Sequence, residues 1–93
     1  MKVKNMTSGA SYNPVANQFI IEGEHCGESG QFFQSYQSVI AFKPANGSSV
    51  TLDSKFWNYS ATTSKYRNQF LGETTKQTQA KIDSGEYILA DLN

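Results

Sequence analysis

The pattern of apolar and polar residues in the first half of the chain predicts β-strands. Within residues 15–24, Phe19, Ile20 and Ile21 are β-favouring and Val15, Asn17, Phe19 and Ile21 share one face, which predicts a strand there. Residues 31–44 carry apolar side chains on both parities, so we predict one long strand with a bend or bulge near residues 35–38. The glycine-rich stretch between them, GEHCGESG at 23–30, indicates a hairpin connection.

Asn46-Gly47 is the strongest short-range turn signal in the chain. Both residues tolerate the positive φ angles that a type I′ turn needs. We therefore expect residues 39–43 and 49–52 to pair as a hairpin. Lys2 to Met6 is a further candidate for a short edge strand.

Helical spacing replaces alternation after Asp53. Apolar residues recur at three- and four-residue intervals in 60–72, and a weaker pattern of the same kind covers 74–84, so we predict a helix in each. Residues 54–59 are expected to form a short capped helical turn. Residues 86–92 would place Tyr87, Leu89 and Asp91 on one face and Ile88, Ala90 and Leu92 on the other, and we predict a closing strand there.

Together these elements predict an α+β domain with an antiparallel sheet of four to five strands and two or three short helices packed on one face. A chain of 93 residues has room for one hydrophobic core, so residues 1–93 are predicted to form a single domain. Residues 1–14, which are rich in turn formers, are a candidate for a loosely ordered N-terminal arm.

Charge and composition narrow the classes of function. Eight basic and eight acidic residues give a net charge of zero, so no global field directs the protein to nucleic acid or to an anionic membrane. No run approaches the ~20 apolar residues of a membrane span, and the first ten residues lack the apolar core of a secretory signal. The single cysteine fits a reducing compartment. We expect a soluble, intracellular protein.

The sequence contains no motif that predicts catalysis or metal binding. His25 and Cys26 are the one pair that could ligate a soft metal, and a zinc site requires about four such ligands. Residues 23–30 lack the Lys-Ser/Thr ending of a phosphate-binding loop. We therefore expect a non-enzymatic protein without a metal or cofactor.

The aromatic segment, defined as residues 53–72, holds the only Trp and the only Arg. Trp, Tyr and Arg are enriched at protein-binding hot spots. The candidate partner-binding residues are Trp57, Tyr59, Lys65, Tyr66 and Arg67. Rings and cations also bind single-stranded nucleic acid, and the candidates for that alternative are Lys55, Lys65, Tyr66, Arg67, Lys76 and Lys81. A third interpretation is that the rings are core and the cations a solvated helix face.

Four segments resemble, in this order and spacing, a family of small uncharacterised proteins of tailed bacteriophages and prophages: NPVANQFII, FFQSYQSVIAF, FWNYSATTSKYRNQFLGET and KIDSGEYILADLN. The run from Trp57 to Gly72 is the most specific, and SGEY at 84–87 is second. The likeness spans nearly the whole chain and implies a phage origin, but it supplies no activity and no catalytic residue.

Small phage proteins without enzyme motifs often bind a host protein, for example to block a defence system such as CRISPR. The resemblance thus implies a binding protein that occupies a surface of a host or phage protein in the cytoplasm of the bacterial host. A single-stranded nucleic-acid-binding module is the first alternative. A self-associating structural component, favoured by neutral charge and edge strands, is the second.

Overall fold

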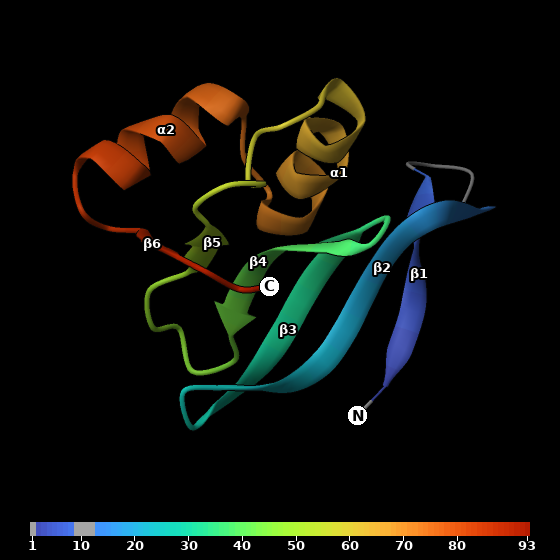
Figure 1. Cartoon of the computed structure of the whole chain (residues 1–93), viewed down its shortest axis with the longest axis horizontal. Helices are drawn as coiled ribbons and strands as arrows, with labels where there is room; N and C mark the ends of the chain where they lie inside the picture. The colour runs from blue at the N-terminus through green and yellow to red at the C-terminus, as the bar shows by residue number, and fades with distance from the viewer. Residues whose placement is uncertain (1, 9–12) are drawn as a thin grey trace.

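A six-stranded sheet with two helices on one face makes up the part of the chain that the computed structural model describes, residues 2–8 and 13–93 (Figure 1). The strands are β1 (Val3–Ser8), β2 (Asn13–His25), β3 (Glu28–Ser35), β4 (Ser38–Pro44), β5 (Thr51–Asp53) and β6 (Ile88–Ala90). The helices are α1 (Ala61–Leu71) and α2 (Thr75–Asp83). The predicted α+β class is confirmed, with two helices.

The strands lie side by side in chain order, β1 to β6. Each of the first four strands pairs antiparallel with the next, whereas β5 and β6 are parallel. Parallel neighbours need a crossover connection, and α1 and α2 supply it here. The sheet is therefore mixed, with one more strand than the upper limit of the predicted antiparallel sheet.

The additional strand comes from residues 31–44, which form two strands instead of one bent strand. A tight turn at Tyr36-Gln37 separates β3 from β4, and Ser35 pairs directly with Ser38. Tyr36 has a φ of 56°, an unusual value for a residue other than glycine, so the sequence contains no ordinary turn signal there. A bulge does occur nearby, because Ile40 is the extra residue between the pairs that flank it.

The tight turn that was expected at Asn46-Gly47 occurs at a different place in the chain. β4 and β5 pair as predicted, but residues 45–50 connect them and Gly47 alone in that loop has a positive φ, 81°. The tight two-residue turn with positive φ at both positions is instead Cys26-Gly27, at 52° and 80°, which joins β2 to β3.

The helix boundaries lie close to the ends of the predicted ranges 60–72 and 74–84. Ser60 is the N-cap of α1 and its side chain accepts from the backbone N–H of Thr63, while Gly72 ends the helix with a φ of 71°. Thr74 and Gln77 form a capping box at the start of α2. Residues 54–59, expected as a short capped turn, form a turn in which the Asp53 carboxylate accepts from the backbone N–H groups of Lys55 and Phe56.

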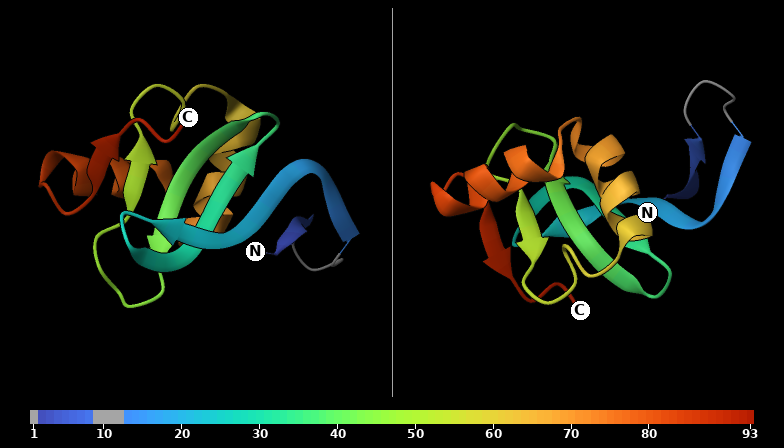
Figure 2. Two further views of the ribbon diagram at one scale, coloured as in Figure 1. Left: turned by 60° about the horizontal axis from the view of Figure 1, so that its bottom comes forward. Right: turned by 90° about the horizontal axis from the view of Figure 1, so that it is seen from above.

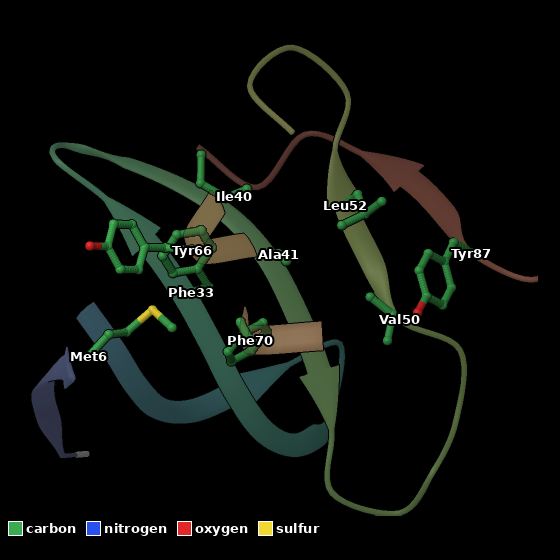
Figure 3. Close-up of a cluster of buried hydrophobic side chains, with 9 residues drawn as sticks. All are labelled: Met6, Phe33, Ile40, Ala41, Val50, Leu52, Tyr66, Phe70 and Tyr87. Carbon is green, nitrogen blue, oxygen red and sulfur yellow. The ribbon is translucent and has the colours of Figure 1, made fainter. Parts of the chain in front are cut away.

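The hydrophobic core lies between the sheet and the helices (Figure 3). Its buried members are Met6, Phe33, Ile40, Ala41, Val50, Leu52, Tyr66, Phe70 and Tyr87. The rings of Phe33 and Phe70 stack with centroids 5.8 Å apart, which fixes α1 on β3. Met6 brings β1 into this core. Of the expected N-terminal arm, residues 3–8 thus form a paired strand, and residues 1 and 9–12 lie outside the described part.

Candidate protein-binding surface

The residues predicted to bind a partner do not form a common exposed patch. Arg67 is 0% exposed and Tyr66 is 9% exposed, and both are among the buried residues of α1. Trp57 is half-buried against the core. Tyr59, at 46% exposure, and Lys65 are the two members that present their side chains to solvent. The prediction of a surface built on Arg67 and Tyr66 is therefore corrected.

Arg67 instead holds three pieces of the chain together. Its Nη1 donates to the carbonyl oxygen of Trp57, and its Nη2 donates to Asn68 Oδ1 at 3.0 Å and Thr75 Oγ1 at 2.8 Å. The guanidinium also lies 5.1 Å from the Trp57 ring. Burial lowers the pKa of Arg67, and the charge of Glu73 opposes that effect only in part. The side chain thus ties the 54–59 turn to α1 and α2.

Lys81, a candidate residue for nucleic-acid binding, instead forms an ion pair within the protein. Its Nζ lies 2.9 Å from Glu73 Oε1, and the same carboxylate accepts from Tyr87 Oη at 2.7 Å and from Thr78 Oγ1. The hydrogen bond to Glu73 raises the pKa of Lys81 to about 12. Burial and the hydrogen bond to Glu73 raise the pKa of Tyr87 to about 12. This cluster joins both ends of α2 to the segment before β6.

The other basic candidates are separate surface residues. Lys55, Lys65 and Lys76 are exposed, on the turn after β5, on α1 and on α2 respectively. Lys65 Nζ lies 5.3 Å from the Tyr66 ring, which is itself buried. The stacking ring and the arginine that a single-stranded nucleic acid would contact are therefore inside the protein.

A different surface stands out on the side of the sheet away from the helices, which we call the open face. In the left view of Figure 2 both helices lie behind the strands, and no helix covers the side toward the viewer. Consecutive register pairs place one residue from every strand in a single row there. The row is Val3, Ile21, Phe32, Phe42, Thr51 and Ile88. Neighbouring residues along the strands, such as Phe33 and Leu52, point to the opposite face and into the core.

The centre of this row is an aromatic cluster held by the β2–β3 hairpin. The rings of Phe32 and Phe42 are 4.7 Å apart, and the His25 ring lies 5.3 Å from that of Phe42. Gly30 makes room for it, since a Cβ at this position would lie 2.8 Å from Phe42 Cζ. Beside the cluster, a hollow of about 390 Å³ reaches to Ile88.

The open face carries almost no charge. Strand alternation places two charged residues on it, Glu28 at the hairpin tip and Asp53 on β5. Asp53 is 1% exposed, and its carboxylate accepts from the backbone N–H groups of Phe56 and Leu92, each at 2.8 Å. Burial raises the pKa of Asp53, but these hydrogen bonds outweigh it and leave the pKa below its ordinary value. Apart from the His25 imidazole, the rest of the face presents apolar, hydroxyl or amide side chains.

Sequence reasoning missed the open face although a signal was present. Residues 31–44 have apolar side chains on both parities, and β2 contains Phe19, Ile20 and Ile21 in succession. A strand with one face in water shows clean alternation, so apolar residues on both parities indicate that the second face is also apolar. We attributed this pattern to a bend instead.

The described residues offer no ready metal site. Within 2–8 and 13–93 there is no group of three or more His, Cys, Asp or Glu side chains placed to hold an ion. His25 Nε2 and Cys26 Sγ lie 3.5 Å apart at the hairpin tip. Across the same two ranges, neither helix has the length and apolar character needed to cross a membrane.

Comparison with known proteins gives a family but no activity. No curated protein and no solved structure has a significant match to the chain. One family model does match, and it covers residues 1–86, which is nearly the whole sequence. The chain therefore belongs to the family of unknown function DUF8033.

Proposed function

We propose that this protein is a non-enzymatic binding module that acts by occupying a surface of another protein, and that the open face is the surface it uses. The observation that carries this proposal is the row from Val3 to Ile88, which crosses all six strands without a charged side chain. Cores of protein interfaces are depleted of charged residues and enriched in aromatic ones. The open face has that composition.

The two ends of the row are exposed, as a contact surface requires. Val3 is 61% exposed and Ile88 is 50% exposed, Ile21 and Phe32 are half-buried, and Phe42 (1%) and Thr51 (7%) are buried. Contiguous apolar surface that is rimmed by polar groups marks interaction sites in monomeric proteins. The rigid pairing of β2, β3 and β4 presents this surface without a folding cost on binding.

The partner that we propose is a host or phage protein, and this part of the proposal rests on the sequence resemblance described above. A component of a host-defence system, such as a CRISPR effector, is one target of this kind. The mode of action would be steric, because the proposal assigns no catalytic residue to the surface.

The test is an affinity pull-down from bacterial lysate with three matched proteins. Ile21→Lys places a charge at the second position of the row, beside Phe32, where the aliphatic stem of lysine can still cover its neighbours. Gln79→Lys adds the same charge at an exposed position on α2, a helix behind the sheet. We expect the wild type and Gln79→Lys to retain one dominant protein that Ile21→Lys loses, with circular dichroism showing all three folded.

Two other outcomes would redirect the proposal. If Ile21→Lys retains the partner and a Tyr59→Ala, Lys65→Ala double variant loses it, then the exposed part of the aromatic segment is the contact surface. If capture disappears after nuclease treatment, the single-stranded nucleic-acid alternative is favoured, with the exposed Lys55, Lys65 and Lys76 as its cations. Its affinity would fall steeply with salt, because phosphate neutralisation releases counterions.

A further inference from the structure

The outer edge of β6 carries unpaired backbone groups and exposed aliphatic side chains. The Ile88 N–H donates to the Val50 carbonyl at 3.0 Å, and the Ala90 carbonyl accepts from Ser54 at 2.8 Å. These groups face β5. Along a strand, the N–H and C=O groups of successive residues point to opposite edges. The N–H and C=O of Leu89 therefore point outward. The side chains of Ile88 and Leu89 at this edge are each about half exposed.

The outer edge of β1 is open in the same way. The Glu22 N–H donates to the Lys2 carbonyl at 2.7 Å, so Lys2 and, two residues on, Lys4 direct their backbone groups toward β2. The backbone groups of Val3 and Asn5 consequently point away from the sheet. Val3 is also the most exposed of the large hydrophobic residues in the described part of the chain.

The two edges differ in charge. β6 is flanked by the exposed residues Glu86 and Asp91, whereas the exposed Lys2 precedes β1 and the exposed Lys4 lies within it. Lys81 lies 3.8 Å from Glu86, but it is closer to Glu73, and Glu86 remains largely exposed. Like charges facing each other across strands are destabilising, and opposite charges are favourable. Each edge is therefore a poor partner for itself and a suitable partner for the other.

We propose that the β6 edge of one molecule binds the β1 edge of a second copy of this chain, which continues the sheet from one molecule into the next. The two edges lie on opposite sides of the sheet (Figure 1), so one molecule can use both at once. Such a head-to-tail contact is heterologous and leaves one free edge at each end, so it produces chains or a closed ring. This contact uses the backbone groups of the two edges, whose residues Val3 and Ile88 also form the ends of the row on the open face.

The proposed contact is weak because it is small. β6 has three residues, so the shared strand pair buries less than the roughly 1,000 Å² expected of a stable interface. Association should therefore be visible at high protein concentration and weaken with salt, which screens the charges at the two edges.

Two edge-blocking variants test the geometry. Val3→Pro and Leu89→Pro each remove an outward-pointing N–H, and proline is tolerated at such edge positions. We expect the wild type to show a mass that rises with concentration in sedimentation equilibrium, and each variant alone to be limited to monomer. An equimolar mixture should form a one-to-one dimer and nothing larger, because one free β6 edge and one free β1 edge remain.

Other results would overturn the proposal. They are a wild type that stays monomeric up to about 1 mM, a Val3→Pro protein that dimerises alone through β6, or a Leu89→Pro protein that dimerises alone through β1. If a proline variant fails to fold, charge reversal replaces it, with Lys2→Glu, Lys4→Glu in one chain and Glu86→Lys, Asp91→Lys in the other. Each should then be monomeric and the mixture should associate; a mixture that stays monomeric contradicts the charge pairing.

Discussion

The guanidinium of Arg67 lies 5.1 Å from the ring of Trp57 and donates a hydrogen bond to the carbonyl oxygen of the same residue. The only arginine and the only tryptophan of the chain are thus joined inside the protein. The acceptors of Arg67 are uncharged oxygens, and no carboxylate of the described residues forms an ion pair with it. A buried cation held in this way depends on the geometry of every partner.

Replacing Arg67 should strongly destabilise the fold. Arg67→Met leaves the Trp57 carbonyl oxygen without a donor and removes the stronger donor to Asn68 Oδ1 and to Thr75 Oγ1, and a buried unpaired group costs ~1–3 kcal/mol. We expect the free energy of unfolding to fall by about 3 kcal/mol or more, measured by urea denaturation. Arg67→Lys should lose most of this stability too, because lysine lacks the planar fork.

The control for this prediction is Lys65→Met, two residues earlier on the exposed face of α1. It should change the free energy of unfolding by less than about 0.5 kcal/mol. Equal effects at the two positions would contradict the structural role assigned to Arg67. Loss of partner binding by a stable Arg67→Met protein would instead restore it as a contact residue.

Local sequence signals predicted most of the fold because they act over short distances. Ser60, Thr74 and the glycines at 72 and 85 are caps or turn residues that act within one helical turn, and they lie where the predicted helices begin and end. The strand pairing of β4 and β5 was likewise predicted from a nearby turn signal, although the turn itself is longer.

The remaining features depend on the tertiary fold. Nothing local to Tyr36 predicts a positive φ, because its backbone N–H bonds to the carbonyl of Asn17 on another strand. The burial of Arg67 has the same origin, since its partners come from three segments that meet only in the folded chain. In the sequence alone, a charged residue beside aromatic residues indicates an exposed binding surface. Only the tertiary fold shows that the three segments bury it.

Stability should fall in acid because of Glu73. Burial raises the pKa of its carboxyl, but hydrogen bonds from Lys81, Thr78 and Tyr87 outweigh burial and hold the pKa below the ordinary value of 4.5. The stabilising contribution is therefore complete above about pH 4.5 and is lost as the pH falls through the lower folded-state pKa. Urea denaturation between pH 7 and pH 3 measures this loss.

The variant Glu73→Gln keeps the size of the side chain and removes its charge. We expect it to lower the free energy of unfolding at pH 7 by about 1.5–3 kcal/mol, the range for a hydrogen-bonded charged group, and to flatten the acid dependence. Glu86→Gln is the matched control, because Glu86 is exposed and its nearest cation is 3.8 Å away. An acid transition that Glu73→Gln leaves unchanged would assign the effect to another carboxylate, with Asp53 the first candidate.

A buried amide is expected to weaken the fold. Gln18 on β2 is 1% exposed, and neither its Oε1 nor its Nε2 has a hydrogen-bond partner. Methionine has nearly the same shape without the polar atoms, so Gln18→Met should raise the free energy of unfolding by about 1–2 kcal/mol. Ser35→Ala nearby should have the opposite effect, because the Ser35 hydroxyl is paired with Thr63 Oγ1 at 2.9 Å. Melting temperatures that move in the same direction for both variants would contradict this distinction.

Gly30 should be irreplaceable for a steric reason, whereas Gly27 should not. A Cβ at Gly30 would meet the Lys43 carbonyl oxygen and would lie 2.8 Å from Phe42 Cζ and 2.9 Å from Pro44 Cα. Two of these three atoms are backbone, so the strands themselves would have to move apart. We expect Gly30→Ala to lower the free energy of unfolding by about 2 kcal/mol or more, within the overpacking range.

Gly27→Ala provides the comparison, because a Cβ there would meet nothing within 4 Å and the cost comes from its φ of 80° alone. That cost should be about 1–2 kcal/mol. Because Gly30 supports the Phe42 ring beneath the open face, Gly30→Ala should also disturb the near-ultraviolet circular dichroism of the aromatic cluster, and Gly27→Ala should leave it unchanged. A Gly30→Ala protein with wild-type stability and spectrum would show that β3 and β4 can separate at little cost, and that the open face is less rigid than its strand pairing indicates.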